Sequence, residues 1–209
     1  MMISASAKYS LHDNLQILTD FGDSAVLLPL SIVFFLWLLV THPASVALKW
    51  LVILMVCNFL IVGLKLYFLA CPAGVAMHSP SGHTGFAILV YGSLTGALAS
   101  GPRERWLRAA VITMGTAFAG AIAASRLMLG KHSVVEVVIG AIVGGVGLAL
   151  FLPIYRQSKG RSRRGPLILL GLVGLLVAVI FHGEQFPAEY YLQSLSMNLG
   201  LHAQACQYN

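Results

Sequence analysis

The chain has 209 residues, of which 58% are hydrophobic and 10% are charged, and its formal net charge is +6. A soluble domain carries about 25% charged residues, so this composition excludes an ordinary soluble protein. It predicts an all-α, polytopic membrane protein with a single membrane-embedded domain over 1–209. Most of the positive charge lies in one loop and does not indicate nucleic-acid binding.

The first 22 residues lack the apolar core of a cleavable signal peptide. They place Leu11, Leu15, Leu18 and Phe21 at helical spacing, which predicts a short amphipathic helix over 1–22, lying in the membrane interface. Apolar runs that suit spanning helices of roughly 20 residues then follow. We expect six transmembrane helices in one bundle over 24–182, at about 24–41, 45–69, 83–99, 108–128, 133–153 and 166–182. An outward-facing tail over 183–209 completes the chain.

Lysine and arginine are enriched in loops on the cytoplasmic side of a membrane. Nine of the 13 basic residues fall after the first, third and fifth expected spans: Lys49, Arg103, Arg105, Arg108, Arg156, Lys159, Arg161, Arg163 and Arg164. We therefore expect a cytoplasmic (inner) membrane protein with both termini facing outward. The basic run 156–166 serves as a topology signal or, alternatively, binds anionic lipid. Cys71 and Cys206 both fall on the outer side, where a disulfide could persist.

Ionisable groups at membrane depth are costly and usually face a protein interior or a watery cavity. Three segments on the outer side carry such groups. In the second expected span, Asn58 and Lys65 share a helix face, although Lys65 could simply extend to the interface. In "HSPSGHTGF" (78–86), Ser81 is predicted to cap a helix whose N-terminus favours an anion, and His83 can supply a proton. The alternative for this segment is a simple cap with an interfacial histidine.

The third segment is "SRLMLGKHSVVE" (125–136). If a helix starts near His132, then His132 and Glu136 form an i, i+4 pair on one face. A carboxylate bonded to one ring nitrogen leaves the other nitrogen able to attack an electrophile. Arg126 has a planar fork that suits phosphate oxygens. A polar loop with a salt bridge at the helix start is the alternative.

Taken together, the three segments suit phosphoryl transfer. That reaction needs positive and N–H groups around the phosphate oxygens, an in-line nucleophile and an acid for the leaving oxygen. The chain has no HExxH or paired CxxC spacing. We therefore expect no metal and no other cofactor.

The same residues resemble the motifs of the type 2 phosphatidic acid phosphatase superfamily. "PSGH" (80–83) is intact, "SR" (125–126) is followed after five residues by His132, and Glu136 stands at the family's aspartate position. Lys65 fits the first motif. The resemblance implies that His132 attacks phosphorus and forms a phosphohistidine, that His83 protonates the leaving group and that Glu136 orients His132. It implies a phosphate-binding role for Lys65, Ser81, Gly82 and Arg126.

The chain departs from the family pattern in two places. The first motif runs "KLYFLACPAG", so the arginine expected beside the proline is absent. His78 and Lys131 are candidates to replace that arginine, and Asn58 is a further auxiliary candidate. The second departure is Glu136, which is one methylene longer than aspartate and is expected to shift the geometry while preserving function.

The resemblance implies a membrane lipid phosphatase that hydrolyses a phosphomonoester or pyrophosphate on a phospholipid or polyprenyl phosphate at the outer face. Two alternatives stay open: a phosphotransferase that passes the phosphoryl group to another lipid, and a non-catalytic lipid-binding or transport protein. Gly140 and Gly144 form a GxxxG pair. We expect it to pack within one bundle, so a monomer is favoured over a homodimer.

Overall fold

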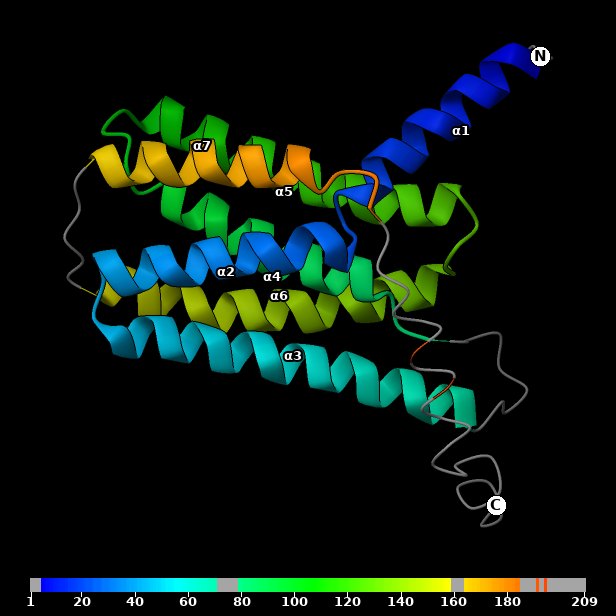
Figure 1. Cartoon of the computed structure of the whole chain (residues 1–209), viewed down its shortest axis with the longest axis horizontal. Coiled ribbons are helices and arrows are strands. Elements are labelled where there is room, and N and C mark those ends of the chain that lie inside the picture. Colours follow the sequence, from blue (N-terminus) through cyan, green and yellow to red (C-terminus); the bar gives the residue numbers. More distant parts are fainter. Residues whose placement is uncertain (1–4, 71–78, 159–163, 185–190, 192–193, 195–209) are drawn as a thin grey trace.

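The computed structural model describes residues 5–70, 79–158 and 164–184, together with Tyr191 and Ser194. This part of the chain is all-α, with no strand (Figure 1). Every apolar run predicted from the sequence is a helix whose ends agree within a few residues. The helices are α1 (Ala5–Asp20), α2 (Ser24–Thr41), α3 (Ala44–Ala70), α4 (Gly82–Leu98), α5 (Arg105–Met128), α6 (Val134–Gln157) and α7 (Arg164–Ile180).

Several of these helices are long and apolar enough to cross a membrane. Among the described residues, length and composition allow four spans: His12–Thr41, Ala44–Phe68, Arg105–Met128 and Val134–Gln157. By contrast, α4 and α7 have 17 residues each. At 1.5 Å per residue they are about 26 Å long, slightly less than a hydrocarbon core of about 30 Å. The structure therefore supports a membrane protein, but it does not confirm six transmembrane helices.

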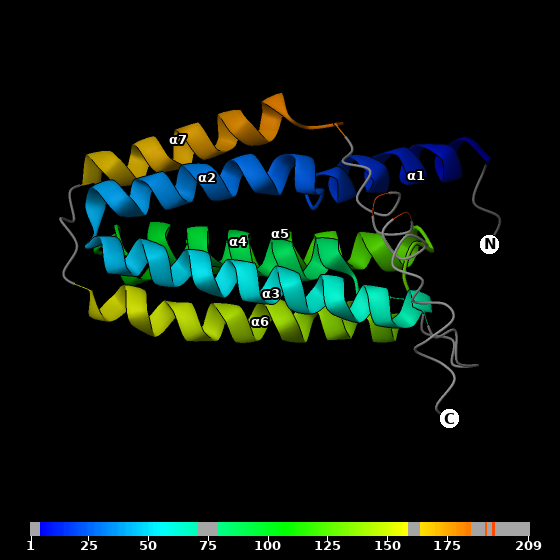
Figure 2. The ribbon, with the colours of Figure 1, turned by 60° about the horizontal axis from the view of Figure 1, so that its bottom comes forward.

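The helices α2–α7 run along a common axis, and α4 is at the centre (Figures 1 and 2). Its neighbours include α5, α6, α3 and α2, while α7 packs along α2. Aromatic side chains fill the core: the Phe34 ring lies 5.0 Å from that of Trp50 and 6.0 Å from that of Phe151, both edge to face. The buried Trp50 indole N–H donates to Ser93 Oγ at 3.1 Å. These contacts join α2, α3, α4 and α6 in the core of the bundle.

Helices α4 and α6 approach each other closely through glycines. A Cβ at Gly85 would lie 2.9 Å from Gly140 O. A Cβ at Gly140 would collide with Ser81 O, and one at Gly144 would collide with Gly85 O. The predicted packing of the GxxxG pair within the bundle is thus confirmed for this pair, whereas oligomeric state stays a prediction. The contact brings the start of α4 against the start of α6.

Helix α1 projects beyond one end of the bundle and contacts α5 (Figures 1 and 2). It corresponds to the helix expected over 1–22, and its position in a membrane interface stays a prediction. A short turn at 21–23 separates it from α2. The candidates His78, Cys71 and Cys206, and most of the expected tail, lie outside the described residues.

Candidate active site

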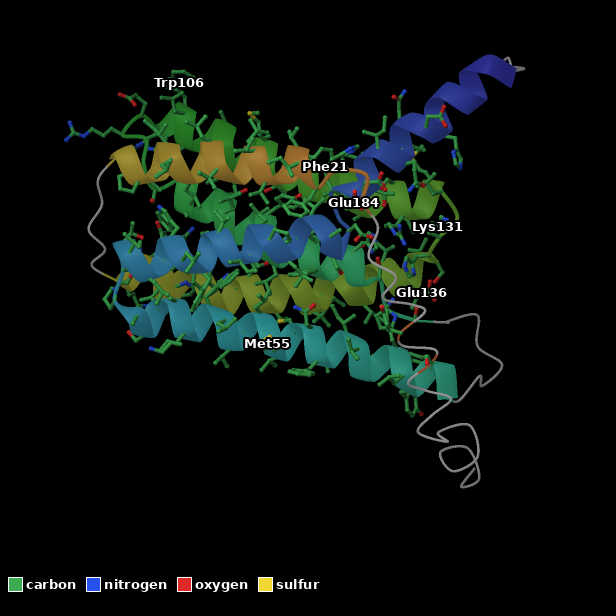
Figure 3. All side chains as sticks on the ribbon, viewed as in Figure 1. Phe21, Met55, Trp106, Lys131, Glu136 and Glu184 are labelled. Carbon is green, nitrogen blue, oxygen red and sulfur yellow. The ribbon has the colours of Figure 1, made fainter. Side chains whose placement is uncertain are left out.

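Residues far apart in the sequence meet at one end of the bundle. This end comprises the last part of α3, the start of α4, the end of α5 and the loop that leads into α6. Lys131 and Glu136 mark it in Figure 3, whereas Trp106, among the basic residues that precede and begin α5, lies at the opposite end. The predicted site residues are therefore separated by the length of the bundle from the basic residues around the start of α5.

Glu136 is the centre of a hydrogen-bond cluster and is only 4% exposed. Its Oε2 lies 3.1 Å from His132 Nδ1 and accepts from Ser133 N at 2.8 Å. Its Oε1 accepts from Ser79 N at 2.8 Å. One carboxylate thus orients the histidine, closes a capping box with Ser133 and binds the segment before α4. The predicted His132–Glu136 pair is present, but it spans the cap of α6 because the helix begins at Val134 rather than at His132.

The loop between Arg126 and His132 folds back on the end of α5. Gly130 takes the left-handed conformation with φ of 64°, which favours glycine. After this reversal, Lys131 N and His132 N both donate to Arg126 O, at 3.1 and 3.3 Å. The five-residue spacer therefore returns the backbone of His132 to Arg126.

Ser81 caps α4 as predicted: its Oγ accepts from Thr84 N at 3.4 Å and lies 2.9 Å from Thr84 Oγ1. Ser81 N donates to Glu136 O at 3.0 Å, which joins the "PSGH" segment (80–83) to the segment 125–136. A Cβ at Gly82 would lie 3.9 Å from Lys65 Cε, so the lysine side chain reaches this helix start. Lys65, from the first motif, and the "PSGH" segment are therefore adjacent in space.

Two cations are buried at this end, since Lys65 and Arg126 are each only 8% exposed. Both lie close enough to His83 and His132 to act on them electrostatically. Burial lowers the pKa of His132, the hydrogen bond to Glu136 opposes this, and the charges of Arg126 and Lys65 add to the lowering. The ring is thereby kept neutral, as a nucleophile requires. A pair of buried cations beside a helix N-terminus is suited to an anion such as phosphate.

The remaining auxiliary candidates are placed less favourably. The Asn58 amide donates to Leu54 O of its own helix at 3.0 Å. The Lys131 side chain is exposed. Sequence reasoning missed Thr19 and Asp23, which are buried at this end: Arg126 Nη1 donates to Thr19 Oγ1 at 3.2 Å, and Asp23 Oδ2 lies 3.4 Å from His83 Nε2. Their only signal was the polar stretch "TDFGD" (19–23) between apolar segments. Within the described ranges, no three His, Cys, Asp or Glu side chains are placed to hold a metal ion.

The comparison with protein families decides the affiliation. The model described as "PAP2 superfamily" matches residues 32–160. The chain belongs to the PAP2 superfamily. Members of this superfamily are phosphatases, which supports an enzymatic function. The matched segment includes all residues from Lys65 to Glu136, so the motif residues of the cluster described above lie within it.

A relative from Klebsiella pneumoniae, named "Uncharacterized 22.5 kDa protein in cps region", is 27% identical over 194 residues. The matched stretch covers 90% of this chain and 92% of the relative. No solved structure matches the chain.

A cavity of about 620 Å³ lies between α4, α5 and α6, below the PAP2 motif residues. Its lining includes Ile88, Gly92, Gly120 and Leu148. Ile88 is five residues beyond His83 on α4, or about 7.5 Å along the helix axis. The cavity does not contain the histidines. Its mostly apolar lining extends from Ile88, on the side of the histidines, to Arg108 and Arg156 at the opposite end of the bundle.

Proposed function

We propose that this protein is a membrane lipid phosphatase that hydrolyses a phosphomonoester or pyrophosphate on a phospholipid or polyprenyl phosphate. The observation that carries the proposal is the Glu136–His132 pair beside the buried Lys65 and Arg126. A neutral, oriented imidazole next to two desolvated cations is the arrangement that attack on a phosphate requires.

In the proposed mechanism, Lys65, Arg126 and the N–H groups at Ser81 and Gly82 bind the phosphate oxygens. Glu136 accepts a hydrogen bond from the Nδ1–H of His132, so that the unprotonated Nε2 attacks phosphorus. The new P–N bond forms while the P–O bond to the leaving group breaks, and His83 gives that oxygen its proton. Water then attacks the phosphohistidine, His83 takes a proton from the water, and phosphate leaves as the P–N bond breaks.

We further propose that α4 and α7 also cross the bilayer, giving six spans in a monomer. The basic loops would face the cytoplasm and the site would open at the outer face of the inner membrane. The separation of the site from the arginines of the opposite end supports this orientation. The apolar cavity below the site supports a lipid rather than a small soluble phosphate.

The test is phosphate release by the purified protein from a panel of lipid phosphates and diphosphates. We expect His132→Ala to abolish release and to prevent labelling of the protein by a ³²P-labelled substrate. His12→Ala is the matched control, because His12 is exposed on α1 and distant in sequence from every motif residue. Equal release by the wild type and His132→Ala would refute the proposal. Transfer of label to an added acceptor lipid, in place of free phosphate, would indicate a phosphotransferase.

A further inference from the structure

The turn between α1 and α2 brings a buried acid into contact with a motif histidine. Asp23 is 7% exposed and its Oδ2 lies 3.4 Å from His83 Nε2. Its other oxygen accepts from Ala25 N at 2.8 Å, as the N-cap of α2. The turn precedes residues 32–160, the segment that matches the family. This acid is therefore a feature of the chain outside the family motifs.

The last turn of α1 contacts the phosphate-binding arginine. Thr19 is only 1% exposed, and its Oγ1 accepts a hydrogen bond from Arg126 Nη1 at 3.2 Å. This hydrogen bond to Thr19 restricts the orientation of the planar Arg126 guanidinium group. The same short segment thus contacts both His83 and Arg126.

The turn is fixed in place by its neighbours. Tyr91 OH on α4 donates to Phe21 O at 2.8 Å, and the Phe21 ring lies 5.7 Å from that of Phe118 on α5. At Gly22, a Cβ would lie 2.7 Å from Ile122 Cγ2, closer than packed carbons tolerate. The glycine is therefore needed for the turn to approach α5. Contacts from both α4 and α5 position Asp23 reproducibly beside His83.

We propose that the α1–α2 turn is a positioning element of the active site, in which Asp23 holds and charges the general acid His83 and Thr19 holds Arg126. The proposal rests on the proposed phosphatase function. Burial of His83 and the positive charges of Arg126 on α5 and Lys65 on α3 all disfavour its protonated form. The carboxylate of Asp23 acts in the opposite direction, through its contact with the ring and through its charge. Because Nε2 keeps its proton in the bond to Asp23, the proton given to the leaving oxygen departs from Nδ1, and neutral His83 remains.

Leaving-group dependence distinguishes this role from a structural one. General acid catalysis matters for an alkoxide leaving group and much less for a good leaving group such as p-nitrophenolate. We expect Asp23→Asn to reduce kcat/KM, which reports the steps up to formation of the phosphohistidine, on an alkyl lipid phosphate by about ten- to hundredfold, with little change in kcat/KM on p-nitrophenyl phosphate. His83→Asn should show the same pattern, and the Asp23→Asn/His83→Asn double variant should lose little more than His83→Asn. Equal losses on both substrates, or no loss, would overturn the role of Asp23.

Two variants control for the fold of the turn. Asp20→Asn changes a neighbouring buried acid that accepts from Gln16 within α1, and it should retain wild-type rates on both substrates. Asp23→Ser keeps an N-cap oxygen for α2 but is too short to reach His83. It should reproduce the leaving-group pattern of Asp23→Asn, and a wild-type pattern would count against the proposal.

Thr19→Val keeps the side-chain volume and removes the hydroxyl. Because Arg126 binds the phosphate rather than the leaving group, we expect kcat/KM to fall about tenfold and equally on both substrates. Wild-type values would overturn the role of Thr19. The underlying function is tested separately by His132→Ala: an inactive His132→Ala beside an unaffected Asp23→Asn refutes the role of the turn alone, whereas an active His132→Ala refutes the phosphatase mechanism itself.

Discussion

Replacing Glu136 by aspartate restores the residue of the family motif, yet we predict that it impairs this protein. Glu136 uses its whole length: Oε1 accepts from Ser79 N at 2.8 Å, while Oε2 accepts from Ser133 N at 2.8 Å and lies 3.1 Å from His132 Nδ1. Aspartate is shorter by one C–C bond, about 1.5 Å. From the same backbone it cannot reach all three partners.

The size of the effect follows from the bonds that are lost. A hydrogen bond to a charged group contributes about 1.5–3 kcal/mol. Loss of the bond to His132 would therefore lower kcat by about ten- to hundredfold. If the bond to Ser133 weakens as well, the capping box of α6 loses about 1 kcal/mol of stability. Glu136→Gln keeps the length but removes the charge and leaves one oxygen to serve all three donors, so we expect a larger loss of kcat.

The assay measures kcat on the best lipid substrate and the thermal midpoint in the same detergent for the wild type, Glu136→Asp and Glu136→Gln. Glu184→Asp is the matched control, because Glu184 is an exposed acid at the same end of the bundle. Its kcat should equal that of the wild type. A kcat of Glu136→Asp equal to or above that of the wild type would show that the length of Glu136 is not what orients His132.

Three further predictions concern pH, the loop and the cavity. Burial lowers the pKa of His132, so this histidine stays neutral to more acid pH, and the fall of kcat/KM at acid pH should occur below the ordinary pKa range of histidine. Glu136→Gln removes a group that raises the pKa of His132, so in this variant kcat/KM should fall at a still lower pH. Gly130→Ala should cost about 1–2 kcal/mol in the free energy of unfolding because of its positive φ, and Gly130→Asn should cost less in the same melting experiment. Gly120→Leu should raise KM for long-chain substrates only, whereas Gly145→Leu should not, because both glycines have open space for a side chain but only Gly120 lines the cavity.

The helices and the central pair of the site could be predicted from the sequence because both depend on local patterns. Apolar runs define α2–α7. Successive spans of a bundle run in opposite directions, so the end of one span lies on the same side as the start of the next. That rule places the end of α3, the start of α4 and the end of α5 together before any contact is known. Likewise, His132 and Glu136 are only four residues apart, so no long-range information is required to pair them.

The role of the α1–α2 turn could not be predicted in this way. Asp23 is 60 residues from His83, and Thr19 is 107 residues from Arg126. An amphipathic helix at the N-terminus is equally compatible with a membrane surface. Only the packing of Phe21 and Gly22 against α4 and α5 shows that the turn enters the bundle. A long-range contact of this kind leaves no periodicity in the sequence.

The close packing of α4 against α6 gives a physical reason for a glutamate at position 136. Because Gly85, Gly140 and Gly144 allow backbone contact, the separation between the two helix starts is set by main-chain atoms. Ser81 N then bonds Glu136 O, and Ser79 N lies where the Glu136 carboxylate ends. A shorter acid could serve His132 only by giving up Ser79, since a backbone packed at this distance cannot move closer. The length of Glu136 therefore matches the spacing that the glycine contact sets between α4 and α6. Glu136 connects the proposed nucleophile His132 to the segment that carries the proposed general acid His83, so a substitution of Glu136 or of these glycines should affect the positions of both histidines.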